Sequence, residues 1–136
     1  MAIDFLNFGK DAKAIVSGAA SGIGEATARL LCGQGLTVIG LDIDGERLSA
    51  LDLGDNFHPM VGDTGKPDAI ETVFAQIAER FGPVCHLVNN AGPPSALPLT
   101  IEEGLAQTAG SVQRMTAAWE DALPPSADQA RVVNVA

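Results

Sequence analysis

The chain has 136 residues, of which 46% are hydrophobic and 18% charged, and this composition predicts one globular domain and excludes disordered, collagen-like and disulfide-scaffold proteins. Eight Lys and Arg against seventeen Asp and Glu give a formal net charge of -9, the wrong sign for binding nucleic acid or an anionic membrane surface. We therefore expect small molecules or other proteins as partners.

The amino-terminal residues and the apolar runs predict a cytoplasmic protein. Met1 to Leu6 include an early acid and lack the basic start of a secretory signal. The longest apolar runs, such as Val84 to Val88, are far shorter than the roughly 20 residues that span a membrane. We expect no membrane association.

The first predicted strand, Ala12 to Ser17, is a nearly continuous apolar run, which is typical of a central strand covered on both faces. The next segment predicts a helix that starts near Gly22 and ends near Gly33 or Gly35. Four apolar residues and one threonine fall on one side of it: Ile23, Ala26, Thr27, Leu30 and Leu31.

Two more strands and two helices follow in the middle of the chain. The strands are predicted at Thr37 to Leu41 and Phe57 to Val61, with a short helix at Gly45 to Leu53 between them. A helix from Pro67 to Phe81 is the clearest, because proline suits a first helical turn and apolar residues recur at i, i+3, i+4 and i+7. Those residues are Ile70, Val73, Phe74, Ile77 and Phe81.

The last third of the chain predicts a strand, a long helix and a final strand. The strands are His86 to Asn89 and Arg131 to Val135, and the helix runs from Glu103 to Leu123. The loop Pro124 to Gln129 separates them. The apolar stripe of the long helix comprises Leu105, Ala109, Val112, Thr116 and Trp119.

The alternation of strands and helices is typical of parallel βαβ units. Right-handed crossovers then give a doubly wound α/β sheet with the strand order 3-2-1-4-5. In such a sheet, ligands bind at the carboxyl ends of the strands, where the strand order reverses. This point lies between the first and fourth strands.

A glycine-rich turn joins the first strand to the first helix. Ser17 to Gly24 reads SGAASGIG, and its glycines permit a tight turn that brings backbone N–H groups close to a pyrophosphate at the helix start. The candidate cofactor residues are Gly18, Ser21, Gly22, Ile23 and Gly24. A plain turn is the alternative, and a GxxxxGK phosphate loop is excluded because no Lys follows.

Asp42 lies 18 residues beyond Gly24, at the carboxyl end of the second strand. A carboxylate there accepts hydrogen bonds from the ribose hydroxyls of an adenosine and repels a 2′-phosphate, which favours NAD over NADP as the cofactor. The alternative is that Asp42 is one loop acid among many. Asp44 is a nearby competitor for the same role.

The two cysteines and two histidines predict no metal site. Cys32 and Cys85 have no metal-ligand spacing, and His58 and His86 stand apart from any acid cluster. We expect reduced, structural cysteines and histidines that bind no metal.

Polar and small residues end the third and fourth strands, in Gly62-Asp63-Thr64 and Asn89-Asn90-Ala91-Gly92. Together with the glycine-rich turn and Asp42, they make the chain resemble the short-chain dehydrogenase/reductase family from about residue 12 to residue 136. The resemblance implies that Asp63 and the backbone at Thr64 hold the adenine. It implies that Asn89, Asn90, Ala91 and Gly92 shape the turn beside the ribose and nicotinamide.

The resemblance also implies a Rossmann-like NAD-binding domain over residues 1–136 and a homo-oligomer that pairs through the long helix. The parent reaction would be hydride transfer between NAD(H) and a small-molecule alcohol or ketone. Family catalysis uses a Ser after the fifth strand, a Tyr-x-x-x-Lys on the following helix and an Asn on the long helix.

The chain departs from the family at those catalytic positions. It has no Tyr, and its lysines, Lys10, Lys13 and Lys66, all precede the fifth strand. Ser95 and Ser111 lie on the wrong side of that strand to replace the family's Ser. Aligning Gly110 with a common family glycine puts Gln107 where the Asn is expected, and no role follows for it.

We therefore expect no catalytic residue in these 136 residues, a sheet that is incomplete at the carboxyl end, and no activity of the chain alone. Two alternatives stay open. One is a non-catalytic dinucleotide-binding or interaction module, and the other is one piece of a split enzyme.

Overall fold

Five parallel strands form one sheet in the order β3-β2-β1-β4-β5, as predicted. The computed structural model describes residues 7–93, 96–127 and 129–136. The strands are β1 (Lys13–Ser17), β2 (Thr37–Asp42), β3 (Phe57–Val61), β4 (His86–Asn89) and β5 (Arg131–Asn134). The predicted bounds hold for β3 and β4, whereas β1 begins and β5 ends one residue inside the predicted range, and β2 extends to Asp42.

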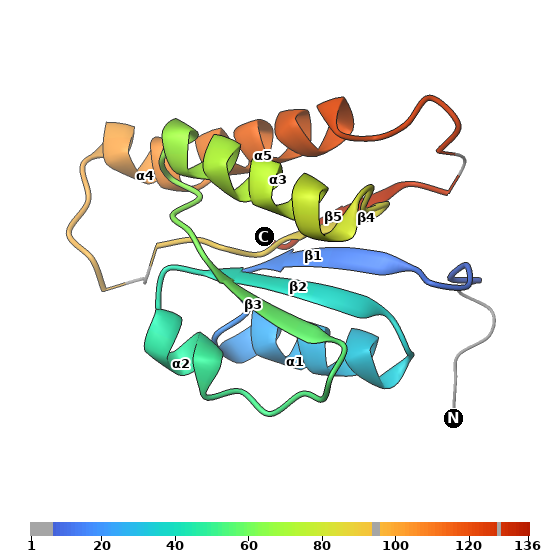
Figure 1. Ribbon diagram of the computed structural model, residues 1–136. Coiled ribbons are helices and arrows are strands. Elements are labelled where there is room, and N and C mark those ends of the chain that lie inside the picture. The colour runs from blue at the N-terminus through green and yellow to red at the C-terminus, as the bar shows by residue number, and fades with distance from the viewer. Residues whose placement is uncertain (1–6, 94–95, 128) are drawn as a thin grey trace.

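Helices cover the sheet on both faces (Figure 1). On one face lie α1 (Gly22–Gly33) and α2 (Gly45–Ser49). On the other lie α3 (Pro67–Phe81), α4 (Ile101–Gln107) and α5 (Ala109–Asp121). This two-sided covering is the doubly wound arrangement, so the predicted Rossmann-like fold class is confirmed. No helix within the described ranges is long and apolar enough to cross a membrane.

Each face of the sheet has its own hydrophobic core, because side chains of β1 alternate between them. Ile15 packs with residues of α3 and α5, including Val73 and Trp119. Ala14 packs on the opposite face with residues that include Ala28 of α1. Burying a large apolar side chain contributes roughly 1.5–3 kcal/mol, so these layers supply much of the stability. Trp119 also donates its indole N–H to the Val84 carbonyl at 2.8 Å.

The prediction for α3 is confirmed in its bounds and in its buried face. The helix begins at Pro67, ends at Phe81 and buries Ile70, Val73, Phe74 and Ile77. The short helix α2 is also present but ends at Ser49, earlier than the predicted Leu53. Asp44 caps it by accepting a hydrogen bond from the Arg47 backbone N–H at 3.0 Å.

The side of α1 that packs on the sheet is not the side with the larger apolar residues. Gly24, Ala28 and Cys32 are buried, whereas Ile23 is 62% and Leu30 is 56% exposed. Small side chains let the helix axis approach the sheet closely, and the glycine-rich turn fixes which side faces inward.

The predicted long helix from Glu103 to Leu123 is wrong, because the segment forms two helices that meet at Thr108. The Thr108 backbone is non-helical, with φ -110° and ψ -92°. The first helix starts at Ile101, after Thr100, whose hydroxyl accepts a hydrogen bond from the Glu103 backbone N–H at 3.2 Å.

The break also changes which side of α5 is buried. The buried residues are Ser111, Met115 and Trp119, and only Trp119 belongs to the predicted stripe. Leu105 of that stripe is exposed on α4. The non-helical residue shifts the rotation of α5 relative to α4, so one continuous periodicity does not describe both helices.

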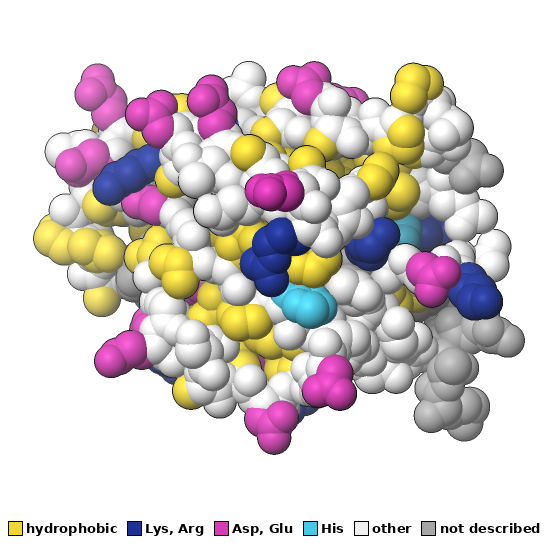
Figure 2. All heavy atoms as spheres, viewed as in Figure 1, with side chains coloured by type: hydrophobic (Ala, Val, Ile, Leu, Met, Phe, Trp, Pro, Cys, Tyr) yellow, Lys and Arg dark blue, Asp and Glu magenta, His cyan; other side chains and the backbone are white. Residues whose placement is uncertain are grey.

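Charge is distributed over the surface and not gathered at one place on the face that Figure 2 shows. Acidic side chains lie around the outer helices and loops of that face, with basic side chains near its centre and at both sides. The face carries no continuous basic patch of the kind that binds nucleic acid.

Candidate cofactor site

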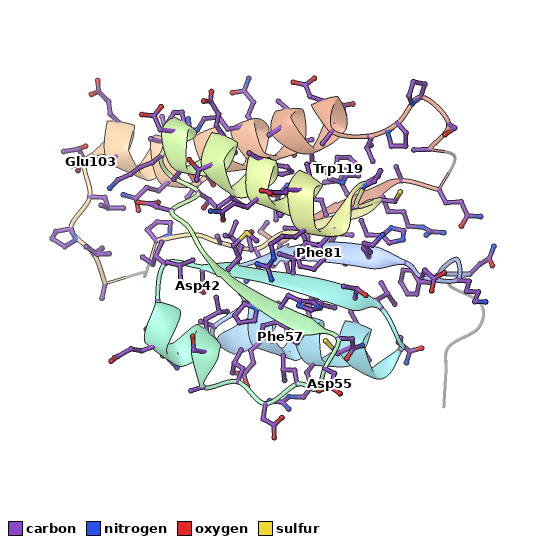
Figure 3. All side chains as sticks on the ribbon, in the orientation of Figure 1. Asp42, Asp55, Phe57, Phe81, Glu103 and Trp119 are labelled. Atoms are coloured by element: carbon purple, nitrogen blue, oxygen red, sulfur yellow. The ribbon has the colours of Figure 1, made fainter. Side chains whose placement is uncertain are left out.

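The carboxyl ends of β1, β2, β3 and β4 surround a cavity of about 190 Å³. Predicted cofactor residues from all four strand ends line it: Gly18, Asp42, Asp63, Thr64, Ala91 and Gly92. The cavity therefore lies at the reversal of strand order, where a doubly wound sheet binds its ligand. Figure 3 shows Asp42 at this end of β2, whereas Asp55 lies at the opposite end of the sheet, before β3.

The glycine-rich turn is too tightly packed for larger residues. Gly18 has φ +68°, and a Cβ there would lie 2.8 Å from Asn90 Nδ2. A Cβ at Gly24 would overlap the Gly18 carbonyl oxygen. Asn90 donates from Nδ2 to that same oxygen at 3.3 Å. Asn90 therefore supports the glycine-rich turn through its side-chain amide.

Ser17 joins the turn after β1 to the turn after β4. Its buried hydroxyl oxygen accepts hydrogen bonds from the backbone N–H groups of Asn90 and Ala91, each at 3.0 Å, and lies 3.3 Å from the Val88 carbonyl, to which it donates. Ser17 was not among the residues that the sequence predicted for the site. The available signal was a hydroxyl at the end of an otherwise apolar buried strand.

The start of α1 leaves backbone donors open to a ligand. Ser21 precedes the helix in an extended conformation, with φ -161° and ψ 166°, and its side chain makes no capping hydrogen bond. Ser21, Gly22 and Ile23 are all exposed. First-turn N–H groups and the helix dipole together favour an anionic group at this position.

Asp42 is held by backbone groups on both of its carboxylate oxygens. Oδ2 accepts from the Ala20 N–H and Oδ1 from the Asp44 N–H, each at 3.0 Å. Each oxygen keeps a further lone pair for a ligand hydroxyl. Asp44, the competing acid, instead caps α2 through Oδ1, so Asp42 is the carboxylate that lines the cavity.

Asp63 orders the wall of the cavity that follows β3. Its Oδ1 accepts from the Gly65 N–H at 2.9 Å, and its Oδ2 lies 3.7 Å from the Lys66 ammonium. Thr64, which lies between Asp63 and Gly65 in the sequence, is buried. Gln107, for which the sequence predicted no role, also lines this wall, from the last residue of α4.

Of the two serines that were considered as catalytic residues, Ser111 is not part of the cavity lining. Ser111 is buried in α5, and its hydroxyl donates to the carbonyls of Gln107 and Thr108 within the helical segment. Ser95 lies outside the described residues. The structure therefore does not bring Ser111 to the cavity.

No metal site is found within residues 7–93, 96–127 and 129–136, where no three His, Cys, Asp or Glu side chains are grouped so that they could hold an ion. Cys32 and Cys85 are free thiols. Burial raises the pKa of the Cys32 thiol, which keeps it protonated and unreactive.

The residues fit a dinucleotide by their shape and by their donor set. A bulkier side chain at Gly18 or Gly24 would fill the turn, and open amides and a fixed carboxylate lie where a pyrophosphate and a ribose would bind. The strand order and this turn define the class of Rossmann-like α/β proteins.

Within that class, the model of the short-chain dehydrogenase family matches residues 12–136, and the chain belongs to this family. The family uses nicotinamide dinucleotide cofactors and small-molecule substrates. The resemblance expected from the sequence is thus confirmed.

Individual relatives are oxidoreductases. The chain is 42% identical to serine 3-dehydrogenase of Agrobacterium fabrum over 80 residues, which are 57% of this chain and 32% of that protein. It is 43% identical over 81 residues to the 3-oxoacyl-(acyl-carrier-protein) reductase FabG of Vibrio cholerae, covering 58% and 33% of the two chains. It is 40% identical to a probable NADP-dependent dehydrogenase of Dichelobacter nodosus, covering 57% and 76%.

A solved structure shows the same fold. The glucose/ribitol dehydrogenase from Brucella melitensis superimposes with a TM-score of 0.82 at 25% identity. The match covers 95% of this chain and 58% of that chain. The matched region spans about a third of the serine dehydrogenase and of FabG.

Proposed function

We propose that the chain binds NAD(H) in preference to NADP(H), as the cofactor-binding portion of an oxidoreductase that interconverts an alcohol and a ketone. The proposed cofactor-binding residues surround or support the cavity at the carboxyl edge of the sheet. They are Gly18, Ser21, Gly22, Ile23, Gly24, Asp42, Asp63, Thr64, Asn90, Ala91 and Gly92.

The position of Asp42 carries this proposal. Its carboxylate lines the cavity and is oriented by the N–H groups of Ala20 and Asp44. It can accept from both hydroxyls of an adenosine ribose. A 2′-phosphate at the same place would bring like charges together, at a cost of several kcal/mol. Among the described residues that line the cavity, none is Lys or Arg, so no cation in the lining offsets that repulsion.

Each part of the cofactor has a counterpart in the site. The start of α1, from Ser21 to Gly24, would hold the pyrophosphate through its N–H groups. Asp63 and Thr64 would hold the adenine, and Ala91 and Gly92 leave room for the nicotinamide side because they are small. The bound cofactor supplies the hydride donor or acceptor.

Calorimetric titration of the 136-residue chain with NAD⁺ and NADP⁺ tests the preference. We expect NAD⁺ to bind at least about tenfold more tightly than NADP⁺. Asp42→Asn should decrease the ratio of the two dissociation constants, because the asparagine side chain has the shape of aspartate without its charge. Asp55→Asn is the matched control, since Asp55 is an exposed aspartate at the other end of the sheet. Tighter binding of NADP⁺ by the unchanged chain would contradict the proposal.

Assembly as a homo-oligomer stays a prediction. The helix expected to pair is divided into α4 and α5, and α4 exposes Ile101 and Leu105. Exposed apolar side chains next to each other are typical of protein interfaces.

A further inference from the structure

Arg114 of α5 joins two segments that line the candidate cavity. Its Nη2 donates to the Gly65 carbonyl at 3.2 Å and to the Ala106 carbonyl at 2.9 Å. Gly65 belongs to the loop after β3 and lines the cavity, and Ala106 immediately precedes Gln107, which also lines it. One guanidinium therefore connects the wall that carries Asp63 with the junction of α4 and α5.

The two segments are packed against each other at this place. A Cβ on Gly65 would lie 3.1 Å from Asp63 Oδ1 and 3.5 Å from Gln107 Cγ. The Gly65 residue is held on both sides, because Asp63 accepts from its N–H at 2.9 Å and Arg114 donates to its carbonyl. This gives a continuous series of hydrogen bonds from Asp63 through Gly65 to Arg114 and Ala106.

The guanidinium is placed tightly. Arg114 is half-buried, and its Nε is buried without a hydrogen-bond partner among the described residues. Gly110 leaves the room it needs, since a Cβ there would lie 3.0 Å from Arg114 Nη1 and 3.2 Å from the Leu105 carbonyl oxygen. Hydrogen bonds from a charged donor are stronger than neutral ones, so the two carbonyl contacts resist displacement.

If Arg114 only stabilised the junction of α4 and α5, one of its two hydrogen bonds would have no explanation. The bond to Ala106 satisfies a carbonyl at the end of α4, where helical partners are missing. The bond to Gly65 spans 49 residues and reaches the loop after β3, which a helix junction does not require.

We propose that Arg114 is a positioning residue, which holds the Asp63 to Gly65 wall in the conformation that receives the adenosine half of the dinucleotide. Arg114 acts through Gly65 and does not itself line the cavity. The inference rests on the proposed function, because it assigns this wall to the adenosine half.

The test compares NAD⁺ dissociation constants of the full 136-residue chain and its variants. We expect Arg114→Met to weaken binding about tenfold, as expected for the loss of a charged donor to the wall. Arg114→Lys retains a cation and should recover part of that loss. Arg80→Met, which removes an exposed guanidinium from the far end of α3, is the matched control and should bind as the unchanged chain does.

A double-mutant cycle separates positioning from a general loss of structure. Combined with Asp63→Asn, Arg114→Met should add little further loss, because both act on the Gly65 wall. When Arg114→Met is combined with Asp42→Asn, the two increases in the NAD⁺ dissociation constant should multiply, since Asp42 belongs to another wall. If Arg114→Met does not fold, as judged by circular dichroism, Arg114→Lys takes its place in the cycle, because it keeps a cation and lacks the planar guanidinium that donates to both carbonyls.

The outcomes distinguish this inference from the proposal on which it rests. Failure of the unchanged chain to bind NAD⁺ overturns both. Binding by the unchanged chain together with an unaltered constant for Arg114→Met, or independent effects of Arg114→Met and Asp63→Asn, overturns the role of Arg114 alone.

Discussion

The hydroxyl of Ser17 makes three hydrogen bonds in a buried place, and a single substitution tests their weight. Ser17→Ala leaves the N–H groups of Asn90 and Ala91 without their acceptor. We expect a loss of about 1–3 kcal/mol in the free energy of unfolding and weaker NAD⁺ binding. Urea unfolding followed by the fluorescence of Trp119, the only tryptophan, measures the first effect.

Ser17→Thr is the matched control for that measurement. It keeps the hydroxyl that joins the two turns, so the stability should stay closer to that of the unchanged chain than the stability of Ser17→Ala does. If Ser17→Ala were as stable as Ser17→Thr, the hydroxyl would have no part in joining the two turns.

His86 makes stability depend on pH. Burial, and secondly the nearby charge of Arg131, lowers the pKa of its imidazole from the ordinary 6.5. Its Nδ1 is buried with no hydrogen-bond partner among the described residues. The unfolded chain therefore takes up a proton at a higher pH than the folded chain, and stability is lost as the pH falls below about 6.5 toward the folded pKa.

The expected result is a urea midpoint that decreases between pH 7.5 and pH 5.5 more steeply for the unchanged chain than for His86→Leu. Leucine fills the buried site without a titrating group. Equal slopes for the two proteins, or a folded-state imidazole pKa above 6.5 by NMR, would show that burial does not control this histidine.

At the scale of an element, α1 presents its small side to the sheet. We expect Ala28→Leu, at a fully buried position, to destabilise the chain by about 1–3 kcal/mol through overpacking. Leu30→Ala, on the exposed side, should change the free energy of unfolding by less than about 0.5 kcal/mol. Chemical denaturation of both variants measures the difference, and the reverse ranking would mean that the larger side packs inward.

The junction of α4 and α5 could not be predicted from the periodic spacing of apolar residues. The apolar spacing between residues 103 and 123 is compatible with one helix. Helix α4 ends at Gln107, where the Thr108 backbone leaves the helical region and Arg114 Nη2 donates to the Ala106 carbonyl at 2.9 Å. The spacing of apolar residues does not contain this contact, because the same guanidinium also donates to Gly65 in the loop after β3.

At the scale of the whole molecule, β5 is an edge strand with both valines exposed. Val132 is 42% and Val133 is 54% exposed, although β5 pairs with β4 along its length. An edge of this kind offers unpaired backbone groups and apolar side chains to a further partner. The two hydrophobic cores are instead built on the buried strands β1, β2 and β4 and the helices that cover them.

We expect no turnover above background when the 136-residue chain is mixed with NADH and ketones. Carbonyl reduction needs an acid near the developing alkoxide, and general acid help is worth about 10²- to 10⁴-fold. The chain contains no Tyr, and its lysines precede residue 67. Steady-state absorbance of NADH measures the rate, and substrate-dependent oxidation at an ordinary dehydrogenase rate would reveal an acid outside this reasoning.

The sequence by itself determined the strand order and the place of the glycine-rich turn, and it predicted Asp42 as a site residue with Asp44 as its competitor, because these depend on local spacing and on the handedness of crossovers. The tertiary structure alone decided which side of α1 is buried, where α4 ends, and that Asp44 caps a helix whereas Asp42 lines the cavity. The physical reason is separation along the chain. Ser17 and Asn90 are 73 residues apart and Arg114 and Gly65 are 49 apart, so their hydrogen bonds exist only once the strands are side by side.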